Sequence, residues 1–130
     1  MLLAACTAHP PHPVEIDPAD VCAFCKMAIS EKRYAAEMIN AEGTAFKFDD
    51  IGCMIHFAKQ RGWIEHPPVR FVHEYDSAVW LEASRATFVR SPEIPSPMAS
   101  GLIAVQGPAK AKQYAARFHG TVHSLAELWK

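Results

Sequence analysis

The chain has 130 residues and a mass of 14.4 kDa, which predicts a single domain. Hydrophobic residues make up 50% of it, and 13 basic and 14 acidic residues give a formal net charge of −1. The basic residues form no stripe that could follow a phosphate backbone, which argues against a nucleic-acid partner. No apolar run reaches the roughly 20 residues that a membrane-spanning helix needs.

The first residues are typical of a bacterial lipoprotein. Leu3–Cys6 matches a lipobox, the signal at which a cysteine is lipidated and becomes the mature N-terminus. The apolar stretch before Cys6 is shorter than a full signal peptide, so residues 1–6 are expected to be a remnant of one. Residues 7–19 are rich in Pro and His and predict a flexible tether. One metal-binding domain is expected over residues 20–130.

Beyond the tether, the hydrophobic pattern predicts two strands joined by a tight turn, at residues 34–40 and 45–48. A helix follows, capped by Asp49 or Asp50 and running to about Arg61. Its expected buried stripe is Ile51, Met54, Ile55 and Ala58. The remaining elements, in chain order, are strands at 69–74, 79–82 and 86–90, a proline-containing loop at 91–100, a strand at 102–105, and helices at 109–118 and 125–129.

The two halves of this pattern resemble each other. A strand, two aspartates and a helix that ends at Gly62 are matched by a strand, Gly107-Pro108 and a helix that ends near Gly120. The sequence therefore predicts an α+β fold of two similar ββα-type halves, each a small antiparallel sheet with one helix.

Cys22 and Cys25 form a Cys-x-x-Cys pair, which occurs in redox centres, in zinc sites and in soft-metal sites. A redox pair normally opens a helix that follows a strand, and no strand is predicted before Cys22. A zinc site needs four donors, and Cys53 with His56, on one helix face, could complete a treble-clef-like set. If Cys6 is lipidated, three thiols remain, and intrachain disulfides cannot pair all of them.

Two methionines in loops favour a soft metal. Met27 lies two residues after Cys25, and Met98 lies in a loop made rigid by prolines, where there is little core to fill. Met38 and Met54 lie in a strand and a helix and are expected to fill the core. Thiolate and thioether donors together suit Cu(I) above all. The pattern thus indicates metal handling rather than the turnover of an organic substrate.

Several motifs, in order and spacing, resemble the NosL family of lipoproteins accessory to nitrous oxide reductase. They are Cys22-x-x-Cys25-Lys26-Met27-x-Ile29, Phe48-Asp49-Asp50-Ile51-Gly52-Cys53-Met54, Val79-Trp80 with Ala86-Thr87-Phe88-Val89, Pro97-Met98-x-x-Gly101-x-x-Ala104 and Gly120-x-Val122. The resemblance covers about residues 20–128. It implies an α+β fold related in shape to alkylmercury lyase. An enzymatic role in organomercurial cleavage would rest on that fold analogy alone, and we expect no enzyme.

The resemblance also implies a periplasmic, membrane-anchored Cu(I) chaperone that supplies copper for assembly of the reductase's copper centres. The implied copper ligands are Cys25, Met27 and Met98. This chain has Lys26 where the family usually has Gly between the Cys and the Met, and so lacks a residue that adopts positive φ at low cost.

An alternative remains open, a zinc or heavy-metal binding module that uses Cys22, Cys25 and Cys53. The expected partners are a copper-accepting reductase or its membrane maturation complex, and the membrane itself through a lipid on Cys6. Thr7 after that cysteine slightly favours the outer membrane. We expect a monomer.

Overall fold

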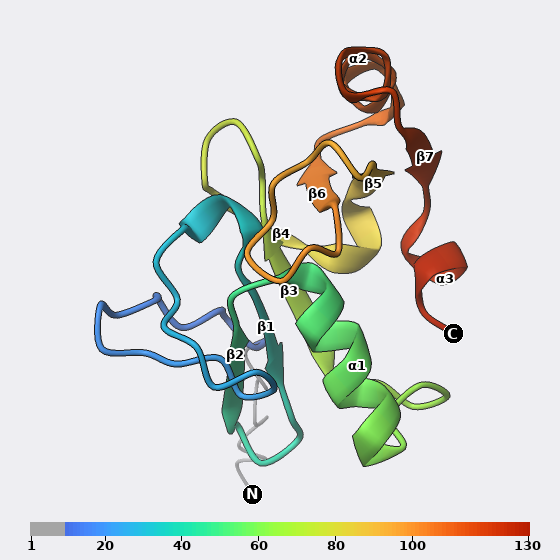
Figure 1. The fold of residues 1–130 in the computed structure, drawn as a ribbon. Coiled ribbons are helices and arrows are strands. Elements are labelled where there is room, and N and C mark those ends of the chain that lie inside the picture. Colours follow the sequence, from blue (N-terminus) through green and yellow to red (C-terminus); the bar gives the residue numbers. More distant parts are fainter. Residues whose placement is uncertain (1–9) are drawn as a thin grey trace, which may run out of the picture.

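The computed structural model describes residues 10–130 and shows an α+β fold with two small antiparallel sheets (Figure 1). The predicted lipobox and Cys6 lie outside the described residues. The strands are β1 (Ala36–Ile39), β2 (Ala45–Phe48), β3 (Val69–His73), β4 (Trp80–Glu82), β5 (Thr87–Arg90), β6 (Leu102–Val105) and β7 (Thr121–His123). The helices are α1 (Ile51–Arg61), α2 (Pro108–Phe118) and α3 (Leu125–Leu128), with short 3-10 turns η1 (Lys32–Tyr34) and η2 (Ala83–Arg85).

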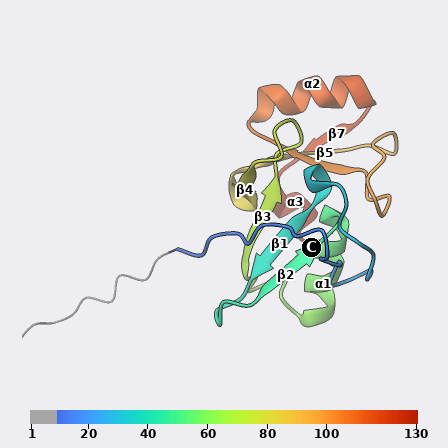
Figure 2. The same cartoon turned by 90° about the vertical axis from the view of Figure 1, so that its left-hand side faces the viewer.

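The first sheet has the strand order β2-β1-β3-β4, so β1 pairs antiparallel with both β2 and β3. Helix α1, which lies between β2 and β3 in the sequence, packs against β1 and β2. The second sheet repeats this plan, with the order β6-β5-β7 and with α2 packed on β5 and β7. In Figures 1 and 2, α2 lies at the far end of the molecule from α1.

The predicted fold of two similar halves is therefore confirmed, as two ββαβ units whose first strand is central. The first sheet has one further strand, β4, which pairs antiparallel with β3 at its edge. Both main helices also end in a left-handed residue, Gly62 with φ 71° and His119 with φ 53°. The two sheets meet where Glu74 bridges to Ala104, beside a hydrogen bond from Tyr75 N to Ala104 O at 2.8 Å.

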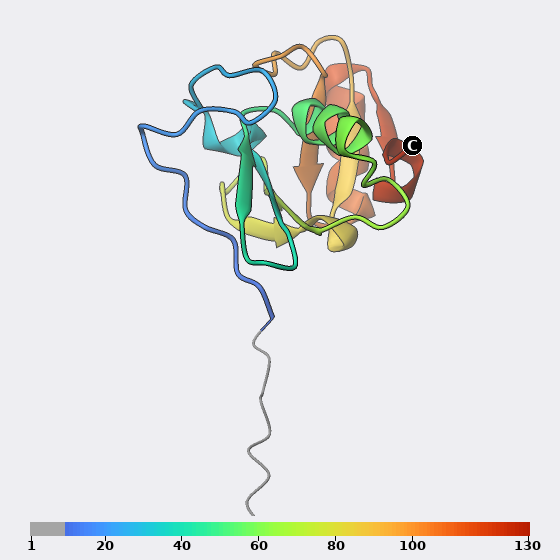
Figure 3. The same ribbon diagram turned by 90° about the horizontal axis from the view of Figure 1, so that it is seen from below.

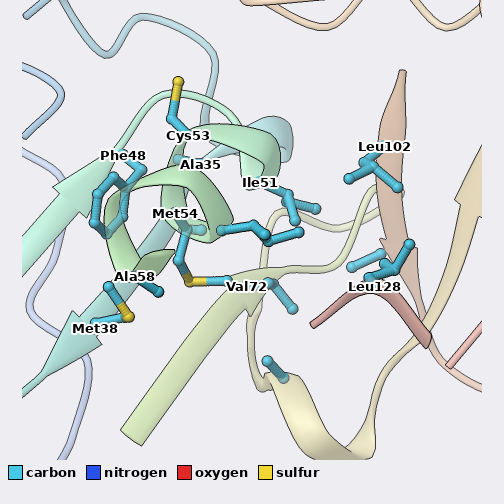
Figure 4. Packing of buried hydrophobic residues seen from close by; sticks show 14 of the residues in the cluster. Ala35, Met38, Phe48, Ile51, Cys53, Met54, Ala58, Val72, Leu102 and Leu128 are labelled. Carbon is cyan, nitrogen blue, oxygen red and sulfur yellow. The ribbon is translucent and has the colours of Figure 1, made fainter. Parts of the chain in front are cut away.

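The main core lies between α1 and the two sheets. All four residues of the predicted helix stripe are buried: Ile51, Met54, Ile55 and Ala58. Figure 4 shows the Met54 side chain on the same side of α1 as Met38, Ala58 and Val72. Met38 and Met54 have no exposed surface, so these two methionines fill the core as predicted.

The structure differs from the predicted elements in places where the pattern is short or local. Residues 34–40 were expected to be one strand, but Tyr34 ends η1 and the strand begins at Ala36. Strand β7 was not predicted, because it has only three residues, of which Thr121 and Val122 are exposed. Such a strand forms through its pairing with β5 and not through its own pattern.

Part of the expected tether contacts the domain. Within residues 7–19, Val14 N donates a hydrogen bond of 2.7 Å to Glu37 Oε1, and Ile16 is only 6% exposed. Glu15 accepts a hydrogen bond from Trp80 Nε1 at 3.1 Å. In Figure 3 this segment lies beside the first sheet on the side away from α1. Residues from about 14 onward thus cover the outer face of the sheet.

Asp50 joins the start of α1 to the loop that carries Met98. Its Oδ1 accepts from Gly52 N at 2.7 Å, which makes Asp50 the N-cap of the helix, and also from the Ser100 hydroxyl. Its Oδ2 accepts from Met98 N at 2.9 Å. Because the Asp50 side chain is fully buried, water cannot take its place as the acceptor for these donors.

Within residues 10–130, no helix is long and apolar enough to cross a membrane.

Replacing Asp50 tests this junction. Asp50→Ala removes the cap and leaves buried donors unpaired, so we expect a loss of about 2–4 kcal/mol in the free energy of unfolding, measured with urea. Asp50→Asn is the matched variant. It keeps a capping oxygen for Gly52 but turns an amide N–H₂ toward Met98 N, so we expect an intermediate loss. Wild-type stability in Asp50→Asn would contradict the anchoring of the loop.

Glu37 is a second buried carboxyl group, on the outer face of β1. Its side chain has no exposed surface, and Oε2 has no hydrogen-bond partner among residues 10–130. Burial raises the pKa of Glu37 to about 7, against the hydrogen bond from Val14 and the charge of Lys47. The charges of Asp20 and Glu15 raise this pKa further.

The raised pKa of Glu37 predicts a pH dependence of stability. An unfolded Glu ionises near pH 4.5, whereas folded Glu37 keeps its proton up to about pH 7. The free energy of unfolding should therefore fall as the pH rises through this window, by roughly 3 kcal/mol at most, and level off above it. Glu37→Gln lacks this titration and should show a flatter profile in urea unfolding. The same pH dependence in both proteins would rule out Glu37 as its source.

Candidate metal centre

The Cys-x-x-Cys segment forms a closed loop in front of α1. Val21 bridges to Ala28 across its base, and Cys22 N donates to Met27 O at 2.8 Å. Lys26 N donates to Cys22 O at 3.0 Å, which tightens the turn between the two cysteines. The backbone of this loop is therefore held by its own hydrogen bonds.

Two details of the turn orient its sulfur atoms. Cys25 N donates to Cys22 Sγ at 3.5 Å, so the turn wraps around that sulfur. Lys26 adopts the left-handed conformation with φ 66°, despite the cost that such a conformation carries for a residue with a Cβ. Its Nζ donates to Ala23 O at 2.9 Å, back across the same turn. The lysine thus takes the positive φ that glycine would adopt more easily.

Four side chains meet behind this turn. Cys22, Cys25, Cys53 and Asp49 each offer one donor atom, and these atoms all lie within 4.8 Å of one another. Asp49 immediately precedes the N-cap of α1, and Cys53 lies in the first turn of the helix. Cys25 Sγ is 3.4 and 3.3 Å from the two carboxylate oxygens of Asp49 and donates a hydrogen bond to them. The cluster joins the N-terminal loop to the start of α1.

Burial separates the three thiols, all of which are free. Cys22 is 0% and Cys53 is 2% exposed, whereas Cys25 is only half-buried. Figure 4 shows the Cys53 sulfur pointing away from Met54 and the core around it. Cys25 is therefore the thiol through which the cluster reaches solvent.

The pKa values of the thiols diverge. A hydrogen bond from Cys53 lowers the pKa of Cys22 to about 6 against its burial, and backbone N–H groups of Phe24, Cys25 and Asp49 lower it further. Burial raises the pKa of Cys25 to about 11, aided by its neighbours Cys22 and Asp49. The hydrogen bond that Cys53 donates to Cys22 also raises the pKa of Cys53, and burial adds to this. These directions favour the thiolate form at Cys22 over Cys25 and Cys53.

The two loop methionines lie at the surface. Met27 is 59% exposed and Met98 is 46% exposed, unlike the buried Met38 and Met54. Each loop methionine adjoins a left-handed residue, Lys26 before Met27 and Ala99, with φ 58°, after Met98. Strained backbone of this kind is common at functional sites.

His56 lies apart from the four clustered side chains. It is exposed, and its ring stacks on Phe24 with centroids 5.5 Å apart and an interplanar angle of 20°. The sequence predicted Asp49 only as a possible helix cap and did not indicate its place beside the thiols. Its spacing of four residues before Cys53 is the signal that could have indicated this, because such residues lie close together on one side of a helix start.

Comparisons with known proteins bear on the family and the fold. A sequence model of the NosL family matches residues 13–130. The fold is similar to the crystal structure of the copper chaperone NosL from Shewanella denitrificans, with a TM-score of 0.82 and 16% sequence identity, over 92% of this chain and 96% of that chain. A search of curated proteins found no match. Because the family match spans the whole folded part, including the cysteine turn and the Met98 loop, the chain belongs to the NosL family.

Proposed function

We propose that this protein is a Cu(I) carrier that receives the ion at a sulfur site on its surface and passes it to a partner. The main support is the half-buried thiol of Cys25, which lies within 4.8 Å of two buried thiols and two residues before the exposed Met27. The membership of the NosL family and the similarity to a copper chaperone from Shewanella denitrificans support the same metal. The role is that of a carrier and not of an enzyme.

The proposed transfer site consists of Cys25, Met27 and Met98. Met27 follows Cys25 in one rigid turn, and the backbone of Met98 is hydrogen-bonded to Asp50, the residue next to the Asp49 that Cys25 contacts. Both methionine side chains are exposed where a soft ion would arrive. Sulfur donors of this kind select Cu(I) over harder divalent ions.

The charge of this donor set suits exchange. Binding of Cu(I) displaces the proton of Cys25 into water. The resulting thiolate and two neutral thioethers leave a Cu(I) complex close to neutral, so a surface position does not require a compensating ion. Thioethers are weaker donors than thiolates, and a partner's ligand can replace one of them while the other donors still hold the ion. Cu(I) then passes between proteins by ligand exchange without being released into water.

The membership of the NosL family supports an inference about the recipient and the location. We infer delivery of copper to the centres of nitrous oxide reductase or to its membrane maturation complex. We also infer a periplasmic monomer attached to the membrane, with a slight preference for the outer membrane, by a lipid on Cys6. The tether would then join this lipid to the part of the chain that is hydrogen-bonded to the sheet at Val14. An anchor of this kind raises the effective concentration of the carrier near its partners.

Zn(II) is the second candidate, because three thiols and one carboxylate within 4.8 Å can supply a tetrahedral set. A structural zinc would make folding depend on the metal. Native mass spectrometry of the purified protein, before and after treatment with a chelator, distinguishes the two cases. Stoichiometric zinc together with unfolding in the chelator would favour zinc over copper.

The copper proposal predicts different effects for the thiol and the thioethers. In anaerobic competition with a chromophoric Cu(I) chelator, Cys25→Ser should lose the tight equivalent of Cu(I). The double variant Met27→Leu/Met98→Leu should pass Cu(I) to the chelator more slowly, by roughly a hundredfold, since each of the two lost donors, at about 1.4 kcal/mol in the transfer state, gives a factor of ten.

Met54→Leu is the matched control, because it replaces a buried methionine on the same helix as Cys53 by a residue of similar volume. It should leave the affinity and the transfer rate unchanged. Wild-type Cu(I) affinity in Cys25→Ser would overturn the proposed site. A wild-type transfer rate in the double methionine variant would remove the thioethers from the mechanism.

A further inference from the structure

Two thiols of the cluster have no part in the surface site. Cys22 and Cys53 are completely or almost completely buried, and they are not joined in a disulfide. The Cys53 sulfur points away from Met54 and its neighbours (Figure 4). Both thiols lie within 4.8 Å of Cys25 Sγ, on its buried side.

The surroundings of Cys22 favour negative charge on its sulfur. Cys22 Sγ accepts a hydrogen bond from Cys25 N at 3.5 Å, within a turn that holds its shape through a left-handed Lys26. Cys53 lies in the first turn of α1, near the positive end of the helix dipole. Backbone N–H groups and a helix N-terminus are the means by which a buried thiolate is stabilised without a cationic side chain.

We propose that Cys22, Cys25 and Cys53 form an interior Cu(I) site that holds the ion, and that Cys25 shares this site with the surface donors Met27 and Met98. The inference rests on the proposed copper function and adds a second position for the ion. Rotation of the half-buried Cys25 side chain would carry Cu(I) from one donor set to the other.

The two donor sets differ in the way that holding and transfer require. Thiolates bind Cu(I) more strongly than thioethers, so the interior set retains the ion. Cys22 and Cys53 are at most 2% exposed, which keeps water and oxidants from an ion bound there. The methionines are exposed and are the donors that a partner can reach and replace. Asp49 is a hard oxygen donor that suits Cu(I) poorly, and its role is to accept the hydrogen bond of Cys25 when the metal is absent.

Selenomethionine labelling of the full chain tests this without any change to the cysteines. X-ray absorption at the copper edge separates a selenium neighbour from a sulfur neighbour, so it reports whether a methionine is a ligand. With one equivalent of Cu(I) supplied anaerobically to the labelled protein, we expect only sulfur around copper. A selenium neighbour in the labelled wild type at this ratio would overturn the interior site.

In the double variant Cys22→Ala/Cys53→Ala, Cu(I) should bind instead to Cys25 and the surface donors Met27 and Met98. Selenium should then appear around copper. Since loss of even the outer partners of a metal site costs about 10–100-fold in affinity, loss of two donors should cost at least about a hundredfold in competition with the chelator. Met54→Leu is again the matched buried control and should change neither readout.

The outcomes separate the two proposals. Unchanged affinity in Cys22→Ala/Cys53→Ala would overturn the interior site and leave the surface carrier site intact. Failure of the wild type to bind Cu(I) at all would overturn the carrier function itself. Should the double variant not fold, as monitored by circular dichroism, the spectrum of the labelled wild type still decides the question.

Discussion

The arrangement of the candidate site depends on the carboxylate of Asp50. It caps α1 through Gly52 N and holds the backbone of Met98, so the start of the helix and a loop from the second half of the chain share one buried acceptor. Asp49, one residue earlier, accepts the hydrogen bond of Cys25. Two adjacent carboxylates therefore connect the three segments that carry the sulfur donors. A buried donor left without an acceptor costs about 1–3 kcal/mol, so separation of these segments would reduce the free energy of unfolding.

The duplicated topology explains how such distant segments come together. Each half places its helix after the second strand of a ββαβ unit, and a parallel bridge between Glu74 and Ala104 joins the two sheets. The loop between β5 and β6 then lies over the N-terminus of α1. At Gly52 a Cβ would come within 2.6 Å of Ser100 Cβ, and at Gly101, with φ 67°, within 2.2 Å of Ser91 O. Glycine at these two positions is what allows the loop to come so close.

The sequence predicted the periodic elements well and the three-dimensional site only in part. The stripe Ile51–Ala58 and the strand Leu102–Val105 carry their own hydrophobic pattern, so their burial could be read from spacing. Strand β7 and the docking of Val14 depend on pairing partners far away in the chain, which spacing does not reveal. The place of Asp49 among the thiols was missed for the same reason, because an Asp before a helix is ordinarily a cap.

The position of Cys25 is the feature that makes this cluster suitable for a carrier and not for a closed structural metal site. A structural site surrounds its metal with donors that are all buried and fixed. Here Cys22 and Cys53 meet that description, but Cys25 is half-buried and lies in a turn whose next residue, Lys26, has a strained left-handed backbone. The exposed Met27 follows at once. A donor set with one side buried and thiol-rich and the other exposed and thioether-rich can bind a soft ion firmly and still offer it to a partner, with Cys25 as the ligand common to both sides.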